Sequence, residues 1–318
     1  MAGIAAAYSL AIKFQKSVLL IDEGAPLSLT SDKSTECYRN WWGGPDNAML
    51  SLMNKSISLM EEYAVECDNS FLMRPHGYLF ATKNKNEADQ LYRQAKDAEI
   101  LGVGCLREIT EFSKYKPNNV ESPISEQDGS DFITNKEIIK NLFPYLNKDT
   151  EAVLHVRRCG SLSAQQLGMY LLEKAREKSC EFQAGKFTGI ETSGGKVSSV
   201  TIEQDGIEKS IATDALVLAP GPHLKKTLEK IGLDLPVVVE KHVKISLPDT
   251  LNVVPRDTPL IIWNDPIELP WTDEEKSHLA ESPETEWLLK TFPPGVHGRP
   301  VGAGNQVLMY WTYDCETS

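Results

Sequence analysis

The chain has 318 residues, of which 41% are hydrophobic and 25% charged, as is ordinary for a globular protein of one large domain or two. Its 45 acidic and 33 basic residues give a net charge of −12, which disfavours nonspecific nucleic-acid binding because phosphate contacts need a basic face. The sequence has no apolar run of about 18 residues, so we expect no membrane span.

The first 24 residues predict a helix that leads into a strand. Residues 2–13 are rich in alanine, and their small side chains let a helix lie close to a sheet; residues 18–21 form a short apolar strand. Glu23 follows this strand, about 20 residues after a glycine turn would occur, where dinucleotide-binding folds hold the adenosine ribose. Gly3 takes the place of the third glycine in G-x-G-x-x-G. A signal peptide is disfavoured because Lys13 comes after the apolar part.

Residues 26–47 predict a long loop that carries Arg39, Trp41 and Trp42. Long loops with aromatic and charged residues are often functional. The next segment, residues 46–67, has apolar residues at helical spacing, and its methionines indicate core packing more than a binding face.

The middle of the chain predicts a mixture of strands and helices. In order, we expect a strand at 77–82, a polar helix at 87–101, an irregular surface segment at 117–131 and a short helix at 136–142.

A helix capped by Ser161 or Ser163 and ending near residue 178 begins the next region. It is followed by three strands separated by Gly-Gly and Asp-Gly turns, which predict an antiparallel meander: 186–192, 197–203 and 207–211. Residues 215–219 then predict a buried strand in the same sheet as residues 18–21. A meander inserted before the returning strand is the flavoprotein variant of the nucleotide-binding fold, so FAD is favoured over NAD.

From residue 235 onward, strand-like and proline-rich pieces predict an antiparallel sheet, with little helix between residues 266 and 283. Alternation along the first of these strands puts Lys241 and Lys244 on opposite faces, so only one of them can face a pocket.

The six cysteines and six histidines are scattered, without C-x-x-C or H-E-x-x-H spacing. We therefore expect no metal site, and a reduced, cytoplasmic location is the simplest interpretation.

Taken in order, these features resemble the D-amino-acid oxidase, glycine oxidase and sarcosine oxidase superfamily of FAD-dependent amine oxidoreductases. The segments that carry the resemblance are 2–8, 18–23, Ser34-Thr35 with Arg39, Gly77-Tyr78-Leu79, Gly160 with Leu167, Lys186-Phe187, and the Leu-Val-Leu-Ala-Pro-Gly run that ends at Gly221.

The resemblance implies roles for individual residues. Ser34 and Thr35 resemble the loop that passes the FAD pyrophosphate and the flavin ring, and the backbone at Phe187 would contact the adenine. Gly221 resembles the end of the family's V-V-x-A-x-G strand and turn. With Gly3 and Glu23, these form the expected cofactor site.

Three departures from the family pattern stand out. The first strand and two fingerprint glycines are missing, Glu36 stands where a glycine is usual, and no glycine-rich turn precedes Ser318. The sequence is therefore expected to be truncated at both ends.

By resemblance, the fold would be α/β, with a Rossmann-like parallel FAD-binding sheet and an antiparallel meander, plus an α+β substrate domain with an antiparallel sheet. We expect the FAD-binding domain to comprise residues 1–70 and 151–230, and the substrate domain to comprise residues 71–150 and 231–318.

The implied reaction oxidises the C–N bond of a small amine or amino acid by hydride transfer to flavin N5, with oxygen or an electron carrier as the acceptor. Arg39 would bind a substrate carboxylate, or else tether its loop through a salt bridge. His76 is a catalytic candidate, with packing as its alternative. Two other functions stay open, a non-catalytic flavin-binding subunit and an NAD-linked dehydrogenase.

Overall fold

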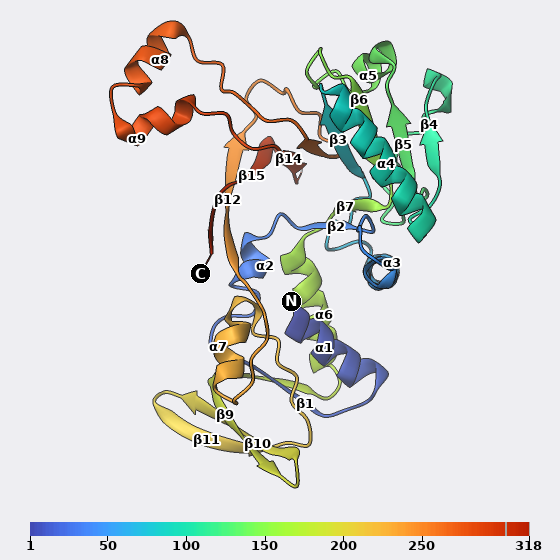
Figure 1. Cartoon of the computed structure of the whole chain (residues 1–318). Helices are drawn as coiled ribbons and strands as arrows, with labels where there is room; N and C mark the ends of the chain where they lie inside the picture. Colours follow the sequence, from blue (N-terminus) through green and yellow to red (C-terminus); the bar gives the residue numbers. More distant parts are fainter. Residues whose placement is uncertain (303, 318) are drawn as a thin grey trace. The chain divides into compact units, whose positions relative to one another are not determined.

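The computed structural model describes residues 1–302 and 304–317, and the chain divides into two compact units (Figure 1). Unit 1 consists in the main of Met1–Glu36 and Leu162–Glu240, and unit 2 of Cys37–Ser161 and Lys241–Glu316. The chain passes from one unit to the other after residues 36, 161 and 240, whereas the expected domain boundaries lie at residues 70, 150 and 230. Residues 37–70 belong to unit 2 because β2 (Cys37–Arg39) pairs with β7 (Cys159–Ser161).

Unit 1 begins with the predicted helix and strand. Helix α1 (Ala2–Tyr8) continues into the π-helical turn η1 (Ser9–Lys13), and β1 (Val18–Asp22) pairs in parallel with β8 (Cys180–Ala184). Helix α6 (Ala164–Arg176) packs against α1 and precedes β8. Its predicted inward residues are buried, namely Leu167, Leu171 and Ala175.

The predicted meander is confirmed. Its sheet has the order β11-β10-β9, formed by β9 (Lys186–Ser193), β10 (Lys196–Gln204) and β11 (Ile207–Ala212) (Figure 1). Gly194, Gly195, Asp205 and Gly206 all have positive φ, as tight hairpin turns between twisted strands require.

The prediction of a buried strand at residues 215–219 is wrong. Among the described residues the parallel sheet of unit 1 contains only β1 and β8, and residues 215–219 belong to no strand. Val217 is 59% exposed, and Ala219 lies beside Gly3 of α1. An apolar run forms a strand only where a neighbouring backbone edge pairs with it, and here the segment runs alongside a helix. The 3₁₀ turn η3 (Gly221–His223) and α7 (Leu224–Glu229) follow.

Unit 2 is built on an eight-stranded sheet. Its order is β12 (Glu240–Pro248), β15 (Gln306–Thr317), β14 (Val296–Val301), β13 (Leu260–Trp263), β3 (Tyr78–Thr82), β6 (Ala152–Val156), β5 (Ser130–Ile133) and β4 (Leu106–Glu108). The expected antiparallel sheet is in fact mixed, because β13 runs parallel to β3 and β4 runs parallel to β5. Strand β5 also begins inside the segment that was expected to be irregular.

Helices cover both faces of this sheet. On one face α5 (Lys136–Leu142) contributes Ile138 and Ile139 to a buried cluster with Leu79 and Val153. On the other face α4 (Lys85–Leu101) contributes Leu91 and Ala95 to a cluster with Tyr78, Leu154, Val156, Cys159 and Leu260. The central strands β3 and β6 are therefore buried on both faces, which explains their continuous apolar character.

The remaining helices lie outside this core. They are α2 (Thr30–Lys33), α3 (Ala48–Glu66), η2 (Phe112–Lys114), α8 (Asp273–Leu279), α9 (Pro283–Glu286) and η4 (Trp287–Leu289). Little helix was expected near α8, but Thr272 and Glu275 form a capping box that starts it. In α3 the fully buried residues are Leu50, Ile57 and Ala64, while Met49 is exposed. Within the described residues, no helix has the length and apolarity needed to cross a membrane.

Candidate functional site

The predicted site residues fall into two groups. The expected cofactor residues all belong to unit 1: Gly3, Glu23, Ser34, Thr35, Phe187 and Gly221. Arg39 and His76, the expected catalytic residues, belong to unit 2. Each group is therefore described within its own unit.

Glu23 directly follows β1 at the carboxyl end of the parallel pair, where Asp22 of β1 lies opposite Ala184 of β8. Its side chain is exposed, and among the described residues it has no hydrogen-bond or ion-pair partner. The neighbouring Asp22 carboxylate instead accepts the Gly24 N–H at 3.0 Å, which shapes the turn. The Glu23 carboxylate is thus available to accept hydrogen bonds from ligand hydroxyl groups at a position where α/β folds bind nucleotides.

Gly3 marks the close approach of α1 to its surroundings. A Cβ atom at this position would lie 3.6 Å from Leu20 of β1 and 3.6 Å from Ala219, which is ordinary van der Waals contact. Small side chains on α1 therefore bring it close to both segments. An alanine would fit the described surroundings of Gly3 without displacing them.

The loop that carries Ser34 and Thr35 ends in an unusual backbone conformation. Glu36 has φ +57°, which is left-handed and strained for a residue other than glycine. The Ser34 hydroxyl accepts the Glu36 N–H at 2.9 Å. The Glu36 carbonyl accepts the Leu162 N–H at 2.9 Å, and its carboxylate accepts the Ala164 N–H at 2.9 Å. The strained backbone of Glu36 is thus held by hydrogen bonds.

In unit 1, Phe187 is half-buried and Gly221 is exposed. Phe187 pairs with Ile202 across β9 and β10, and its carbonyl oxygen accepts a hydrogen bond from Lys230 Nζ at 2.9 Å. Gly221 has φ +59°, and a Cβ atom there would have no neighbour within 4 Å. The open Gly221 turn and the unpartnered Glu23 carboxylate fit the adenosine half of a dinucleotide, which needs an acceptor for its ribose hydroxyls and room for backbone approach.

Arg39 is held by aromatic rings in unit 2. Its Cζ atom lies 4.3 Å from the centre of the Trp42 ring and 6.0 Å from that of Tyr78. In the β2–β7 pair it lies opposite Cys159. Stacking on an aromatic face restrains a guanidinium while leaving its N–H donors directed outward along the ring plane.

A second cluster on the unit 2 sheet was missed by the sequence analysis. His297 of β14 pairs directly with Tyr310 of β15, with ring centres 4.6 Å apart, and His242 of β12 stacks on Tyr310 at 5.4 Å. Burial lowers the pKa of His297, and the positive charge of Arg39 lowers it further, so the imidazole is neutral near neutral pH. Alternation along β14 could have placed His297 on one face, but its partner is only visible in the folded sheet.

His76 lies just before β3 and is 6% exposed. Its Nε2 atom is 2.9 Å from the Ser161 hydroxyl, and its Nδ1 atom is 3.1 Å from the Gly77 carbonyl oxygen. Burial lowers the pKa of His76 to about 4. Because both nitrogens are engaged and the ring is buried, the geometry favours the packing alternative over a catalytic one.

The His76 backbone leads into a buried polar network. His155 Nε2 lies 3.1 Å from the His76 carbonyl oxygen, and His155 Nδ1 lies 2.9 Å from the Tyr115 hydroxyl. Arg157 binds Asp131 at 2.8 Å, and burial raises the pKa of Tyr115 to about 12. Together with the contact between His76 and Ser161, these bonds attach residues before β3 to β6 and β7, so they support the sheet that carries Tyr78.

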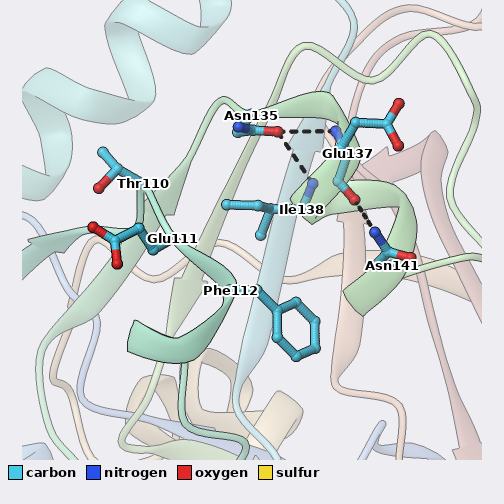
Figure 2. Close-up of a pocket in the computed structure, with 7 residues that line it drawn as sticks. All are labelled: Thr110, Glu111, Phe112, Asn135, Glu137, Ile138 and Asn141. Carbon is cyan, nitrogen blue, oxygen red and sulfur yellow. Dashed lines mark hydrogen bonds between the residues drawn. The ribbon is translucent and has the colours of Figure 1, made fainter.

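One surface hollow has none of these residues in its lining. It encloses about 680 Å³ on unit 2 and is lined by Thr110, Glu111, Phe112, Asn135, Glu137, Ile138 and Asn141 (Figure 2). The Asn135 side chain accepts the Glu137 and Ile138 N–H groups and thereby caps α5, as Figure 2 shows. The Asn135 amide in this hollow thus serves the helix. Within residues 1–302 and 304–317, no group of three or more His, Cys, Asp or Glu side chains is placed to hold a metal ion.

A family model described as FAD dependent oxidoreductase matches residues 1–269. The chain belongs to this family. As a member of the FAD-dependent oxidoreductase family, it uses FAD, which decides against the NAD-linked alternative. No curated protein matches the chain in a sequence search.

Several solved structures share its fold. They include L-proline dehydrogenase from P. horikoshii (TM-score 0.69, 15% identity), glycine oxidase from Geobacillus kaustophilus (0.66, 16%) and L-alpha-glycerophosphate oxidase from Mycoplasma pneumoniae with FAD bound (0.64, 12%). The matches cover 98%, 99% and 99% of this chain, and 68%, 68% and 69% of those chains. They confirm the predicted α/β fold class of this FAD-dependent oxidoreductase.

Proposed function

We propose that this FAD-dependent oxidoreductase oxidises the C–N bond of a small amino acid or amine. The observation that carries the proposal is the Arg39 guanidinium, held over Trp42 and without a carboxylate partner among the described side chains. A cation that is restrained but not neutralised suits the carboxylate of an amino acid.

In this proposal unit 1 is the cofactor-binding part. Glu23 would accept hydrogen bonds from the adenosine ribose, and the exposed Gly221 turn leaves room for the cofactor to approach the backbone. Ser34 and Thr35 would contact the pyrophosphate and the flavin side. The Phe187 carbonyl oxygen has two lone pairs, so it would accept a hydrogen bond from the adenine beside the one it accepts from Lys230 Nζ.

Unit 2 is the substrate-binding part in the same proposal. Arg39 would bind the substrate carboxylate through two parallel N–H donors, which sets the orientation of the α-carbon. FAD, when bound, supplies the hydride acceptor. The neutral His297 imidazole, whose pKa is lowered by burial, would accept a hydrogen bond from the substrate amine and so help to orient it. His76 would contribute through packing.

The flavin spectrum tests the reaction. The protein loaded with FAD and kept without oxygen should lose its visible flavin absorbance when glycine, sarcosine, or D- or L-proline is added. Oxygen is then admitted. Recovery of this absorbance identifies an oxidase, and absence of recovery identifies a dehydrogenase. If dithionite bleaches the flavin but no amine or amino acid does, the chain is a non-catalytic flavin-binding subunit and the proposal is wrong.

The cofactor role of Glu23 is tested by fluorescence titration of FAD into the apoprotein. Glu23→Gln removes the charge and turns one of the two acceptor oxygens for the ribose hydroxyls into a donor, so it should weaken FAD binding about tenfold. Glu181→Gln is the matched control, because Glu181 is an exposed carboxylate on the neighbouring strand β8. Equal dissociation constants for both variants would remove Glu23 from the site.

A further inference from the structure

We propose that Glu36 is a positioning residue that locks the Ser34–Glu36 loop onto the start of α6 before any cofactor binds. The effect on FAD binding rests on the proposed cofactor role of Ser34 and Thr35, whereas the locking itself can be measured in the apoprotein. Hydrogen bonds to three groups of Glu36 fix a left-handed backbone conformation that ordinarily favours glycine.

Three contacts carry the inference, and each involves a different group of Glu36. Its N–H donates to the Ser34 hydroxyl, its carbonyl oxygen accepts from the Leu162 N–H, and its carboxylate accepts from the Ala164 N–H, all at 2.9 Å. The first bond closes the turn within the loop. The other two tie the end of the loop to the segment that enters α6. Together they leave little freedom for the loop to change its path.

The backbone conformation shows what these contacts must offset. A glutamate at φ +57° is strained relative to glycine, and such strain persists only where the surroundings over-determine it. Ala164 is the first residue of α6, so its N–H has no acceptor within the helix. The Glu36 carboxylate satisfies this N–H and lies where the positive end of the helix dipole favours an anion.

Helix capping alone does not account for this arrangement. Ser163 is the N-cap residue of α6, and its hydroxyl accepts the Gln166 N–H at 3.3 Å. The start of α6 therefore has a cap of its own, and among the described residues the Ser163 hydroxyl has no hydrogen bond to the loop. Glu36 provides what Ser163 does not, a link between the loop and the helix. This difference makes Ser163→Ala a matched control for loss of capping without loss of the link.

The experiment measures amide hydrogen exchange at Glu36, Leu162 and Ala164 in the apoprotein, together with the FAD dissociation constant. Glu36→Gly should raise the exchange rates about tenfold and weaken FAD binding by a similar factor, because the charged acceptor is lost and the backbone is freed. Glu36→Gln keeps an acceptor oxygen and should stay within about threefold of the wild type in both measurements. Ser163→Ala should speed exchange at Gln166 while Glu36 exchange and FAD affinity stay unchanged.

Two results would overturn the proposal. If Glu36→Gly and Ser163→Ala change loop exchange equally, Glu36 only caps the helix. If Glu36→Gly leaves loop exchange unchanged, the link does not restrain the loop. Should the wild-type chain bind no FAD, the cofactor role fails, but the apoprotein exchange rates still decide whether Glu36 locks the loop.

Discussion

The Arg39 guanidinium lies over the ring of Trp42, with its Cζ atom 4.3 Å from the ring centre. This contact replaces the salt bridge that the sequence suggested as an alternative, since no described carboxylate pairs with Arg39. The positive charge is therefore fixed in place without being neutralised. After burial, which has the larger effect, the positive charge of Arg39 also lowers the pKa of the His297 imidazole.

Arg39→Lys should raise the KM for an amino-acid substrate by about tenfold to a hundredfold while the flavin spectrum stays unchanged. A lysine carries the charge but loses both the planar stacking on Trp42 and the two-pronged hydrogen bonding to a carboxylate. Steady-state kinetics test this with two substrates, an amino acid and an amine that lacks a carboxylate. The KM should rise for the amino acid alone. The exposed Arg93 of α4 provides the control variant Arg93→Lys. An equal loss for both substrates would contradict carboxylate binding.

The buried histidines should make unit 2 sensitive to acid. Burial lowers the pKa of His76 from 6.5 to about 4, so between these values the unfolded chain takes up a proton that the folded chain does not. The free energy of unfolding should thus fall as the pH drops through this range, by about 3 kcal/mol for His76 alone. His155 adds to the loss, since burial lowers its pKa well below the ordinary value.

Urea denaturation at a series of pH values measures this effect. His76→Gln removes the titrating group but keeps a nitrogen within reach of Ser161, so its stability should depend less steeply on pH. His278→Gln is the control, because that side chain is 84% exposed. Identical pH slopes for the wild type and His76→Gln would show that His76 does not titrate as its burial implies.

Asp265 should be important for the stability of unit 2. Its carboxylate, in a residue that is 3% exposed, accepts hydrogen bonds from the Thr82 hydroxyl and the Lys83 N–H, both at 2.6 Å. These bonds connect Asp265 to residues that precede it in the chain by 183 and 182 positions. Asp265→Ala should lower the free energy of unfolding by about 3 kcal/mol, because two donors lose a charged acceptor. Asp265→Asn should lose roughly half as much. The exposed Asp97→Asn on α4 should be neutral in chemical denaturation, and a loss as large as that of Asp265→Ala would argue against burial as the cause.

Two glycines with positive φ should respond differently to alanine. At Gly77 (φ +85°) a Cβ atom would meet His155 Nε2 at 2.2 Å and the Val156 carbonyl oxygen at 2.7 Å, so Gly77→Ala should cost about 3–5 kcal/mol. At Gly221 (φ +59°) no atom lies within 4 Å, and Gly221→Ala should cost only about 1 kcal/mol for the backbone conformation. Thermal unfolding of both variants tests the contrast, and similar losses would mean that the clash at Gly77 is relieved by movement of His155.

Much of the local structure could be predicted from the sequence. The helix at 136–142 is confirmed as α5, and the three meander strands are confirmed within one or two residues. The residues that specify them are neighbours in the chain: a capping Asn135 before α5, and turn residues with positive φ between the strands. The position of Glu23 after a parallel strand was also correct.

Other features depend on contacts between distant segments. Residues 215–219 are as apolar as a buried strand, but whether they form one depends on a partner edge, and their neighbour is α1. Strand β13 lies parallel to β3 although about 180 residues separate them in the chain. The pairing of His297 with Tyr310 follows from strand register, which a local pattern does not specify.

By itself, the sequence determined those elements of this protein that local signals specify, such as α5 and the three meander strands, since hydrophobic periodicity, caps and turns act over a few residues. The tertiary structure alone decided that Arg39 stacks on Trp42, that His76 is buried and neutral, and that Glu36 binds the start of α6. The burial of His76 and the bond from Glu36 to α6 join segments far apart in the chain, and the Arg39–Trp42 contact depends on the pairing of β2 with β7. All three are defined only when the sheets and helices have packed.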